Sequence, residues 1–189
     1  MTTVNYVFLN LNNAIMKIFR LSLFILLCAF SAAAQDEGTF TKIGDAVPAF
    51  SFETVKGKTV NISDYKGKLI LINLFATWCP PCNIELPLVQ SRIWDKHKDD
   101  ANFAFFVFGR EEGWDKLDPY KAKKGFTFPI LPDADRSIFK KFASISIPRN
   151  ILVDEQGKII YQSIGYSPEE FNQLVKLIDT HLSKLAKAK

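Results

Sequence analysis

The sequence predicts a single α/β domain, residues 47–189, behind an N-terminal leader. Continuous apolar runs of strand length, such as Leu69–Phe75, alternate with segments in which apolar residues recur at helical spacing. Strands that are apolar at successive positions are typical of sheets covered on both faces. No internal repeat divides the 189 residues, and the chain without its leader has the length of one domain.

The N-terminal leader has the pattern of a secretory signal peptide. Lys17 and Arg20 precede the uncharged run Leu21–Ala34, which ends in small residues. This run is shorter than the roughly 20 residues that a membrane-spanning helix requires. We interpret residues 1–34 as an upstream extension and signal peptide cleaved after Ala34, which predicts export to the periplasm.

Two alternatives to cleavage remain open. Cys28 would allow attachment of a lipid, and an uncleaved leader would anchor the protein in the membrane. With the leader removed, Cys79 and Cys82 are the remaining cysteines of the sequence. Two cysteines in an exported protein are oxidised by default, so a working pair requires a partner that sets its redox state.

The charge of the chain argues against one class of partner. The formal net charge is +4 at pH 7, and the sequence contains no basic stripe interleaved with aromatic residues. Nucleic acid is therefore not an expected partner. Nothing in the sequence indicates a second domain, and we expect a monomer.

The first expected elements are a polar segment, a hairpin and the central strand. Residues 35–46 are polar, and we expect them to be flexible. Ala49–Thr54 and Lys58–Ile62 are predicted strands joined by a turn that contains Gly57. Leu69–Phe75 is the predicted central strand.

A helix is expected directly after the central strand. Pro80 and Pro81 suit its first turn, where a missing N–H would have had no partner. The helix should continue to about Lys98, with a kink at Pro87. Cys79 then lies at a helix N-terminus beyond the carboxyl end of a strand, where α/β sheets carry their reactive groups.

The rest of the chain alternates strands and helices. The expected strands are Asn102–Phe108 and Phe128–Leu131, followed by a closing hairpin of Asn150–Val153 and Lys158–Tyr161. These four segments are rich in β-branched and aromatic residues and are bounded by turn residues.

Three further helices are expected. They are Glu111–Lys124, broken near Pro119; Asp135–Phe142; and a last helix with Ser167 as N-cap and Glu170 completing a capping box. The apolar stripe of the last helix contains Phe171, Leu174, Leu177, Ile178 and Leu182, and the lysine-rich tail beyond it is expected to fray.

The motif Cys79-Pro-Pro-Cys82 predicts a redox-active dithiol. Backbone N–H groups and the dipole at a helix N-terminus favour a thiolate, so the pKa of Cys79 should lie below the value of about 8.5 for a free cysteine. Cys82 follows one helical turn later, close enough to close a disulfide. We expect this pair to be the redox centre, with no metal and no other cofactor.

Three other uses of the pair fit the sequence less well. A zinc site requires two further ligands, and Cys28, His97 and His181 stand at no recognisable ligand spacing. A purely structural disulfide across so short a loop would remove little unfolded-state entropy. A thiol peroxidase would need threonine and proline at set distances before the nucleophile, where this chain has Ala76 and Ile72.

With these features in place, the chain resembles the thioredoxin superfamily and, within it, the extracytoplasmic TlpA/ResA branch. The resemblance covers roughly residues 45–180 and rests on several motifs together. They are Phe50-Ser-Phe with Gly57-Lys-Thr-Val60, Gly67-Lys68, Asn73-Leu-Phe-Ala-Thr-Trp-Cys-Pro-Pro-Cys82, Glu85-Leu-Pro87, Ser146-Ile-Pro-Arg-Asn-Ile-Leu-Val-Asp154 and Gly157-Lys158.

The resemblance implies a thioredoxin fold: a central mixed β-sheet flanked by helices, with an added N-terminal β-hairpin. It also implies a cis bond between Ile147 and Pro148 that faces the cysteines, with Ile147 in contact with substrate. The full set of expected substrate-binding residues is Trp78, Pro80, Pro81, Ile147 and Pro148.

Three positions differ from the thioredoxins proper or from many relatives. Thioredoxins carry a buried aspartate where this chain has Asn73, and the acid has moved to Glu85, one turn beyond Cys82. We assign Glu85 as the proton acceptor for Cys82. Arg149 and Asn150 stand where many relatives carry threonines, which leaves the shape of the substrate groove open.

The expected function is thiol:disulfide oxidoreduction outside the cytoplasm. The resemblance implies reduction of exported proteins, apocytochrome c among them, with a membrane-embedded thiol reductant as electron donor. The lack of a strongly basic residue beside Cys79 favours a reductant over a disulfide-forming oxidase. The alternatives are a thioredoxin-fold chaperone or binding module and, as a rival enzyme, a thiol peroxidase.

Overall fold

A computed structural model describes residues 38–187 of the chain. The predicted leader, Cys28 and residues 35–37 lie outside this range.

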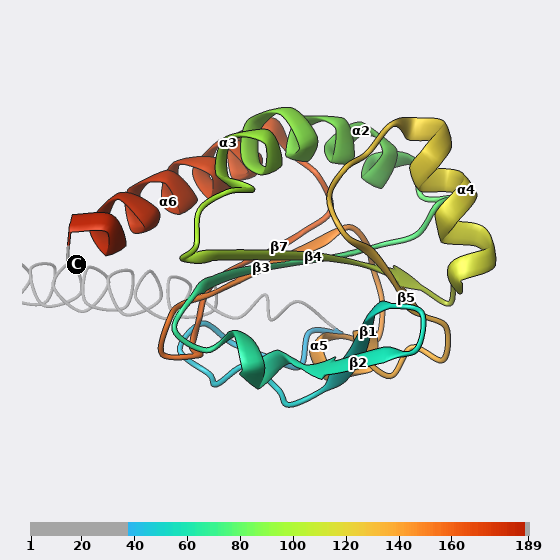
Figure 1. Ribbon diagram of the computed structural model, residues 1–189, viewed down its shortest axis with the longest axis horizontal. Coiled ribbons are helices and arrows are strands. Elements are labelled where there is room, and N and C mark those ends of the chain that lie inside the picture. The colour runs from blue at the N-terminus through green and yellow to red at the C-terminus, as the bar shows by residue number, and fades with distance from the viewer. Residues whose placement is uncertain (1–37, 188–189) are drawn as a thin grey trace, which may run out of the picture. The chain divides into compact units, whose positions relative to one another are not determined.

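The central sheet contains five strands in the order β5-β4-β3-β6-β7 (Figure 1). Its strands are β3 (Leu69–Phe75), β4 (Phe103–Arg110), β5 (Ile130–Asp133), β6 (Arg149–Val153) and β7 (Ile159–Ile164). β3 pairs with β4, and β4 with β5, in parallel, whereas β6 is antiparallel to both β3 and β7. This is the mixed sheet that the resemblance implies.

Helices cover one face of the sheet, and the N-terminal hairpin lies on the other (Figure 1). The elements on the helical face are α2 (Pro80–Val89), the π-helical turn η2 (Gln90–Trp94), α3 (Asp95–His97), α4 (Trp114–Lys124) and α6 (Pro168–Lys187). The elements on the opposite face are β1 (Ser51–Val55), β2 (Lys58–Asn61), η1 (Ile62–Tyr65) and α5 (Phe139–Phe142).

The side chains of β3 alternate between two cores. All residues of β3 are buried, as predicted for the central strand. Leu71 and Phe75 join the core on the helical side, whereas Ile72 and Leu74 join the core on the hairpin side. Because successive side chains of a strand point to opposite faces, Asn73 is directed towards the helices.

The predicted N-terminal hairpin is confirmed. β1 and β2 are antiparallel, with Phe52 opposite Val60. The ring of Phe52 lies 4.8 Å from that of Phe106 and 5.2 Å from that of Phe108, in edge-to-face arrangements. These aromatic contacts attach the hairpin to β4.

Residues 38–46, part of the segment expected to be flexible, form main-chain hydrogen bonds with distant parts of the chain. The N–H of Phe40 donates to the carbonyl of Phe142 at 2.8 Å, and the N–H of Gly44 donates to the carbonyl of Ile159 at 2.8 Å. Composition does not reveal these partners, because they come from distant parts of the chain that only the fold brings alongside.

The helix predicted over Glu111–Lys124 is continuous through Pro119 and begins at Trp114. Pro119 has no N–H to donate to the carbonyl of Asp115, but Asp115 is exposed, so water can reach that carbonyl. Gly125 ends the helix in the left-handed conformation, with φ at 69°.

Two neighbouring elements are also displaced from their predicted bounds. β5 begins at Ile130, and the predicted helix over Asp135–Phe142 is reduced to α5. The carboxylate of Asp133 accepts hydrogen bonds from the N–H groups of Ile138 and Phe139, at 2.9 and 2.8 Å. This carboxylate therefore replaces the missing helical partners at the start of α5.

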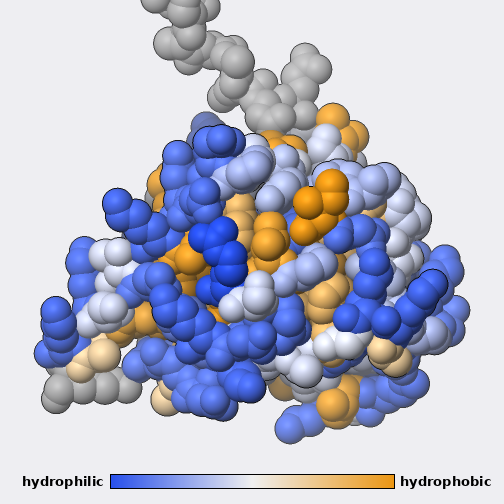
Figure 2. Space-filling model, turned by 90° about the horizontal axis from the view of Figure 1, so that it is seen from above, coloured by the Kyte–Doolittle hydropathy of each residue, from blue (hydrophilic) through white to orange (hydrophobic). Residues whose placement is uncertain are grey.

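The predicted amphipathic character of α6 is confirmed. The Ser167 hydroxyl accepts a hydrogen bond from the N–H of Glu170 at 3.2 Å, and the buried residues are Phe171, Leu174, Ile178 and Leu182. The helix continues to Lys187, so the expected fraying beyond Leu182 is not observed in the described residues. Polar and charged side chains cover most of the helical face (Figure 2), and between residues 38 and 187 no helix has the length and apolar character needed to cross a bilayer.

Candidate active site

Cys79 and Cys82 form a disulfide at the N-terminus of α2. Their Cα atoms are 5.3 Å apart. Cys79 is the N-cap residue, and its Sγ accepts a hydrogen bond from the backbone N–H of Cys82 at 3.3 Å. Pro80 and Pro81 occupy the first helical positions, so their missing N–H groups interrupt no helical hydrogen bond.

Trp78 presents apolar surface directly beside the disulfide. Its residue surface is 61% exposed, which excludes a position in the core. The guanidinium of Arg110 lies 5.8 Å from the centre of its ring, within the range of a cation–π interaction. Pro80 is also exposed and Pro81 is partly so, whereas Cys79 itself is buried.

The loop before β6 meets the cysteine pair. The bond between Ile147 and Pro148 is cis, as the resemblance implies. The carbonyl oxygen of Ile147 lies 3.9 Å from the Sγ of Cys79. Ile147 is half-buried and Pro148 is buried. The fold thus brings Ile147 next to Cys79 from a position far along the chain.

Side-chain hydrogen bonds of Glu112 and Asn83 hold the turn between β3 and α2. The buried carboxylate of Glu112 accepts from the N–H of Thr77 at 2.9 Å and from its hydroxyl at 2.6 Å. The side-chain amide of Asn83 donates to the carbonyls of Thr77 and Cys79, both at 2.9 Å. The hydroxyl of Tyr120 donates to the amide oxygen of Asn83 at 3.1 Å.

Glu85 lies beneath α2 and is 1% exposed. Its carboxylate accepts hydrogen bonds from the amide of Asn150 at 2.6 Å and from the amide of Asn73 at 3.1 Å. Burial raises the pKa of Glu85 from 4.5 to about 7, although both amide hydrogen bonds act in the opposite direction. A carboxyl group with this pKa can both accept and release a proton near neutrality.

Arg149 and Asn150, where the resemblance led us to expect threonines, have separate structural partners. The Arg149 guanidinium donates to the carbonyls of Ile145 and Ser146, at 2.8 and 3.0 Å, and to the hydroxyl of Thr39 at 2.8 Å. Arg149 therefore holds the loop that precedes the cis bond, whereas Asn150 contacts Glu85.

The Redoxin family model matches residues 42–178. The chain belongs to the Redoxin family. The sporulation thiol-disulfide oxidoreductase A of Bacillus subtilis is 32% identical over 143 residues, 74% of this chain and 83% of that relative. Thiol-disulfide oxidoreductase ResA of Bacillus thuringiensis is 27% identical over 158 residues, 81% of this chain and 90% of that relative.

A solved structure supports the same assignment. The solution structure of a candidate protein disulfide isomerase from Bacteroides thetaiotaomicron is 36% identical, with a TM-score of 0.74, and the match covers 78% of this chain and 94% of that one. The predicted TlpA/ResA-like resemblance is therefore confirmed, and this Redoxin-family protein is a thioredoxin-like thiol-disulfide oxidoreductase.

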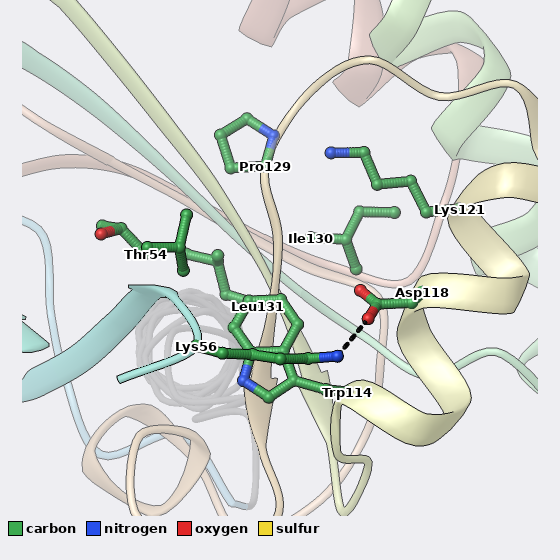
Figure 3. Close-up of a pocket in the computed structure, with 9 residues that line it drawn as sticks. Thr54, Lys56, Trp114, Asp118, Lys121, Pro129, Ile130 and Leu131 are labelled. Atoms are coloured by element: carbon green, nitrogen blue, oxygen red, sulfur yellow. Dashed lines mark ion pairs between the residues drawn. The ribbon is translucent and has the colours of Figure 1, made fainter. Parts of the chain in front are cut away.

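The structure also contains a pocket that lies apart from the cysteines. A pocket of about 470 Å³ lies between the β1–β2 turn, α4 and β5, where Lys56 and Asp118 form an ion pair across 2.9 Å (Figure 3). None of the predicted site residues lines it. In the part of the chain that the structure describes, no group of three or more histidine, cysteine or acidic side chains is placed to hold a metal ion.

The sequence did not identify Asn83 or Glu112 as parts of the site. Asn83 is an ordinary polar residue of the helix, and the partner of Glu112, Thr77, lies 35 positions earlier in the chain. A sequence signal did exist for a different part of the site: Asn73 is a polar residue within an otherwise apolar strand. Such a residue requires a buried partner, but the sequence does not say which.

Proposed function

We propose that this protein is exported and reduces disulfide bonds of other exported proteins through Cys79 and Cys82. The observation that carries this proposal is the disulfide at the N-terminus of α2, with Trp78 exposed beside it and the Ile147 carbonyl 3.9 Å from the Cys79 sulfur. A substrate cysteine that replaces Cys82 as the partner of Cys79 would meet this surface.

The reaction passes two electrons from the protein dithiol to a substrate disulfide. The Cys79 thiolate attacks one substrate sulfur, the substrate S–S bond breaks, and the departing thiolate takes a proton. Cys82 then loses its proton to Glu85 and attacks the Cys79 sulfur. The protein disulfide forms, and the second substrate thiolate leaves.

The substrate would lie across the surface formed by Trp78, Pro80, Pro81, Ile147 and Pro148. In support, the carbonyl of Ile147 is close enough to Cys79 for an extended peptide to pair with this loop while its cysteine is attacked. Apocytochrome c is a candidate substrate by the ResA-like resemblance, and a membrane-embedded thiol reductant is the candidate electron donor. The leader pattern supports export to the periplasm, with anchoring by lipid or by an uncleaved leader as alternatives.

The proposal is tested by trapping the intermediate. Cys82→Ser cannot complete the second step, so it should accumulate a mixed disulfide between Cys79 and a disulfide-containing substrate such as insulin, visible on a non-reducing gel. Cys79→Ser should reduce insulin with dithiothreitol no faster than the reagent alone. Turnover by Cys82→Ser at the parental rate would overturn the resolving role, and equal rates for Cys79→Ser and the parent would favour a binding module.

The direction of electron flow is tested by the reduction potential of the pair. Equilibration with a dithiothreitol or glutathione buffer should give a potential near that of the reducing thioredoxins, about −270 mV. A value near −120 mV would identify a disulfide-forming oxidase instead. Consumption of peroxide would identify a thiol peroxidase.

A further inference from the structure

A row of buried polar side chains crosses the sheet beneath Glu85. Asn73 of β3 pairs in register with Asn150 of β6, and Asn150 pairs in register with Ser163 of β7. Directly opposed residues of an antiparallel pair carry their side chains on the same face, so all three point towards α2. Asn73 and Asn150 are as deeply buried as Glu85, within an otherwise apolar core.

The donors of this row converge on one carboxylate. The Asn150 amide nitrogen donates to Glu85 Oε1 at 2.6 Å, with a longer contact to the Ser163 hydroxyl at 3.4 Å. The Asn73 amide nitrogen donates to Glu85 Oε2 at 3.1 Å and to the Asn150 amide oxygen at 2.9 Å. Each carboxylate oxygen therefore receives one amide N–H, and the two amides also bind each other.

Both oxygens of Glu85 accept hydrogen bonds from amide N–H groups, and this arrangement suits the ionised form of the carboxyl. A reversed Asn73 amide would place its oxygen against the carboxylate and against the Asn150 oxygen, which are both acceptors. The observed orientation avoids this contact even though it leaves Asn73 Oδ1 buried without a hydrogen-bond partner among the described residues. The two amide nitrogens thus donate to three acceptor oxygens, two from Glu85 and one from Asn150. This requirement fixes the orientation of both amides.

The groups that face Glu85 come from four elements. Cys82 precedes it on α2, Asn73 comes from β3 and Asn150 from β6. Tyr161 of β7 is an ionisable neighbour, and its own pKa is raised mainly by burial and in part by Glu170 and Glu85. Burial raises the pKa of Glu85 and the two amides lower it, and no cation among residues 38–187 is a further cause.

We infer that Asn73 and Asn150 are positioning residues that stabilise the ionised form of Glu85 and so set the pH at which Cys82 becomes an attacking thiolate. This inference rests on the proposed role of Glu85 as proton acceptor for Cys82. Without the amides, burial alone would keep a proton on Glu85 at neutral pH, and Cys82 would have no nearby acceptor.

The test separates the two sulfur attacks within one reaction. Reduced protein is mixed with one equivalent of 5,5′-dithiobis(2-nitrobenzoic acid), and absorbance of the released thionitrobenzoate is followed by stopped flow from pH 5 to 10. Attack by Cys79 releases the first thionitrobenzoate, and attack by Cys82 on the resulting mixed disulfide releases the second. The second phase should accelerate with pH through a midpoint near the Glu85 pKa of about 7.

Asn150→Leu and Asn73→Leu remove one amide donor each with little change in volume. Each should move the midpoint of the second phase upward by about one to two pH units, since a hydrogen bond to a charged group is lost. The second phase should then be roughly 5- to 50-fold slower at pH 7 and should approach the parental rate above pH 9. The first phase should be unchanged.

Ser163→Ala is the matched control, because it alters the same buried row and leaves both amide–carboxylate contacts in place. Its midpoint should stay close to that of the parent. A merely structural role for the asparagines would slow both phases at every pH. Because either leucine variant could fold poorly, the Glu85 carboxyl is also titrated by ¹³C NMR in the oxidised parent and in Asn150→Ala, which removes the same amide donor without adding a branched side chain. An upward shift supports the inference, and an unchanged titration overturns it.

Glu85→Gln distinguishes failure of this inference from failure of the proposed function. If Glu85→Gln abolishes the pH-dependent limb while both asparagine variants leave it in place, the inference is overturned and Glu85 keeps its role. If Glu85→Gln leaves the limb unchanged, the proposed role of Glu85 is wrong, and the inference falls with it.

Discussion

The pKa values of two glutamates in this chain are shifted in opposite directions. Burial beneath α2 raises the pKa of Glu85 to about 7. The pKa of Glu155, in the turn between β6 and β7, is lowered to about 2, chiefly by the hydrogen bond with His181, whose Nε2 lies 2.7 Å from Glu155 Oε2. The same side chain therefore titrates near neutral pH in one place and only in strong acid in the other.

The difference lies in what replaces water around each carboxylate. Glu155 remains partly exposed and has a histidine partner, so its ionised form is favoured. Glu85 has lost its water and receives neutral amides instead, which offset only part of the cost of burying a charge. Stability favours the first arrangement, and proton transfer near neutral pH requires the second.

The largest expected effect is on activity. Glu85→Gln should lower insulin reduction at pH 7 by about 100-fold, which is the lower end of the contribution of a positioned proton acceptor. Glu155→Gln changes the same chemical group far from the cysteines and should reduce insulin at the parental rate. If both variants lost a similar share of insulin reduction, the loss in Glu85→Gln would reflect stability and not proton transfer.

The second effect is on stability at neutral pH. A group whose pKa is raised by folding stabilises the protein below its unfolded pKa, and that stability is lost as pH rises through the folded value. For Glu85 the loss falls between about pH 4.5 and 7 and amounts to roughly 3 kcal/mol. Urea unfolding of the oxidised protein should show this decline, and Glu85→Gln should flatten it. A parental slope in the variant would contradict the raised pKa.

The smallest expected effect is a loss of stability in acid, where Glu155 becomes protonated. The lowered pKa of Glu155 contributes stability that is present above pH 4.5 and is lost as pH falls through about 2. Because the pair is partly exposed, Glu155→Gln should cost only about 1 kcal/mol at pH 6 and nothing by pH 2. Urea titrations of variant and parent at both pH values measure the difference. A constant difference would mean that packing, and not charge, is responsible.

The sequence predicted most of the fold because the responsible signals are local. The apolar run of β3, the two prolines after Cys79 and the cap at Ser167 each act on their own element. Other features depend on more than local signals. Residues 38–46 form main-chain hydrogen bonds with α5 and β7, which composition does not reveal. The predicted break at Pro119 was wrong, because the carbonyl of Asp115, which Pro119 cannot serve as a donor, is exposed to water.

The sequence by itself determined where the proposed redox pair stands: two cysteines one helical turn apart, placed by a strand and by prolines at the start of a helix. It also marked Glu85 as one turn beyond Cys82, because helical spacing is a local property. Only the tertiary structure decided what surrounds that carboxylate. Asn73 and Asn150 come from strands far apart in the chain, and strand register alone aligns their amides beneath α2. The proton affinity of a buried group depends on such neighbours, so it could not be read from spacing.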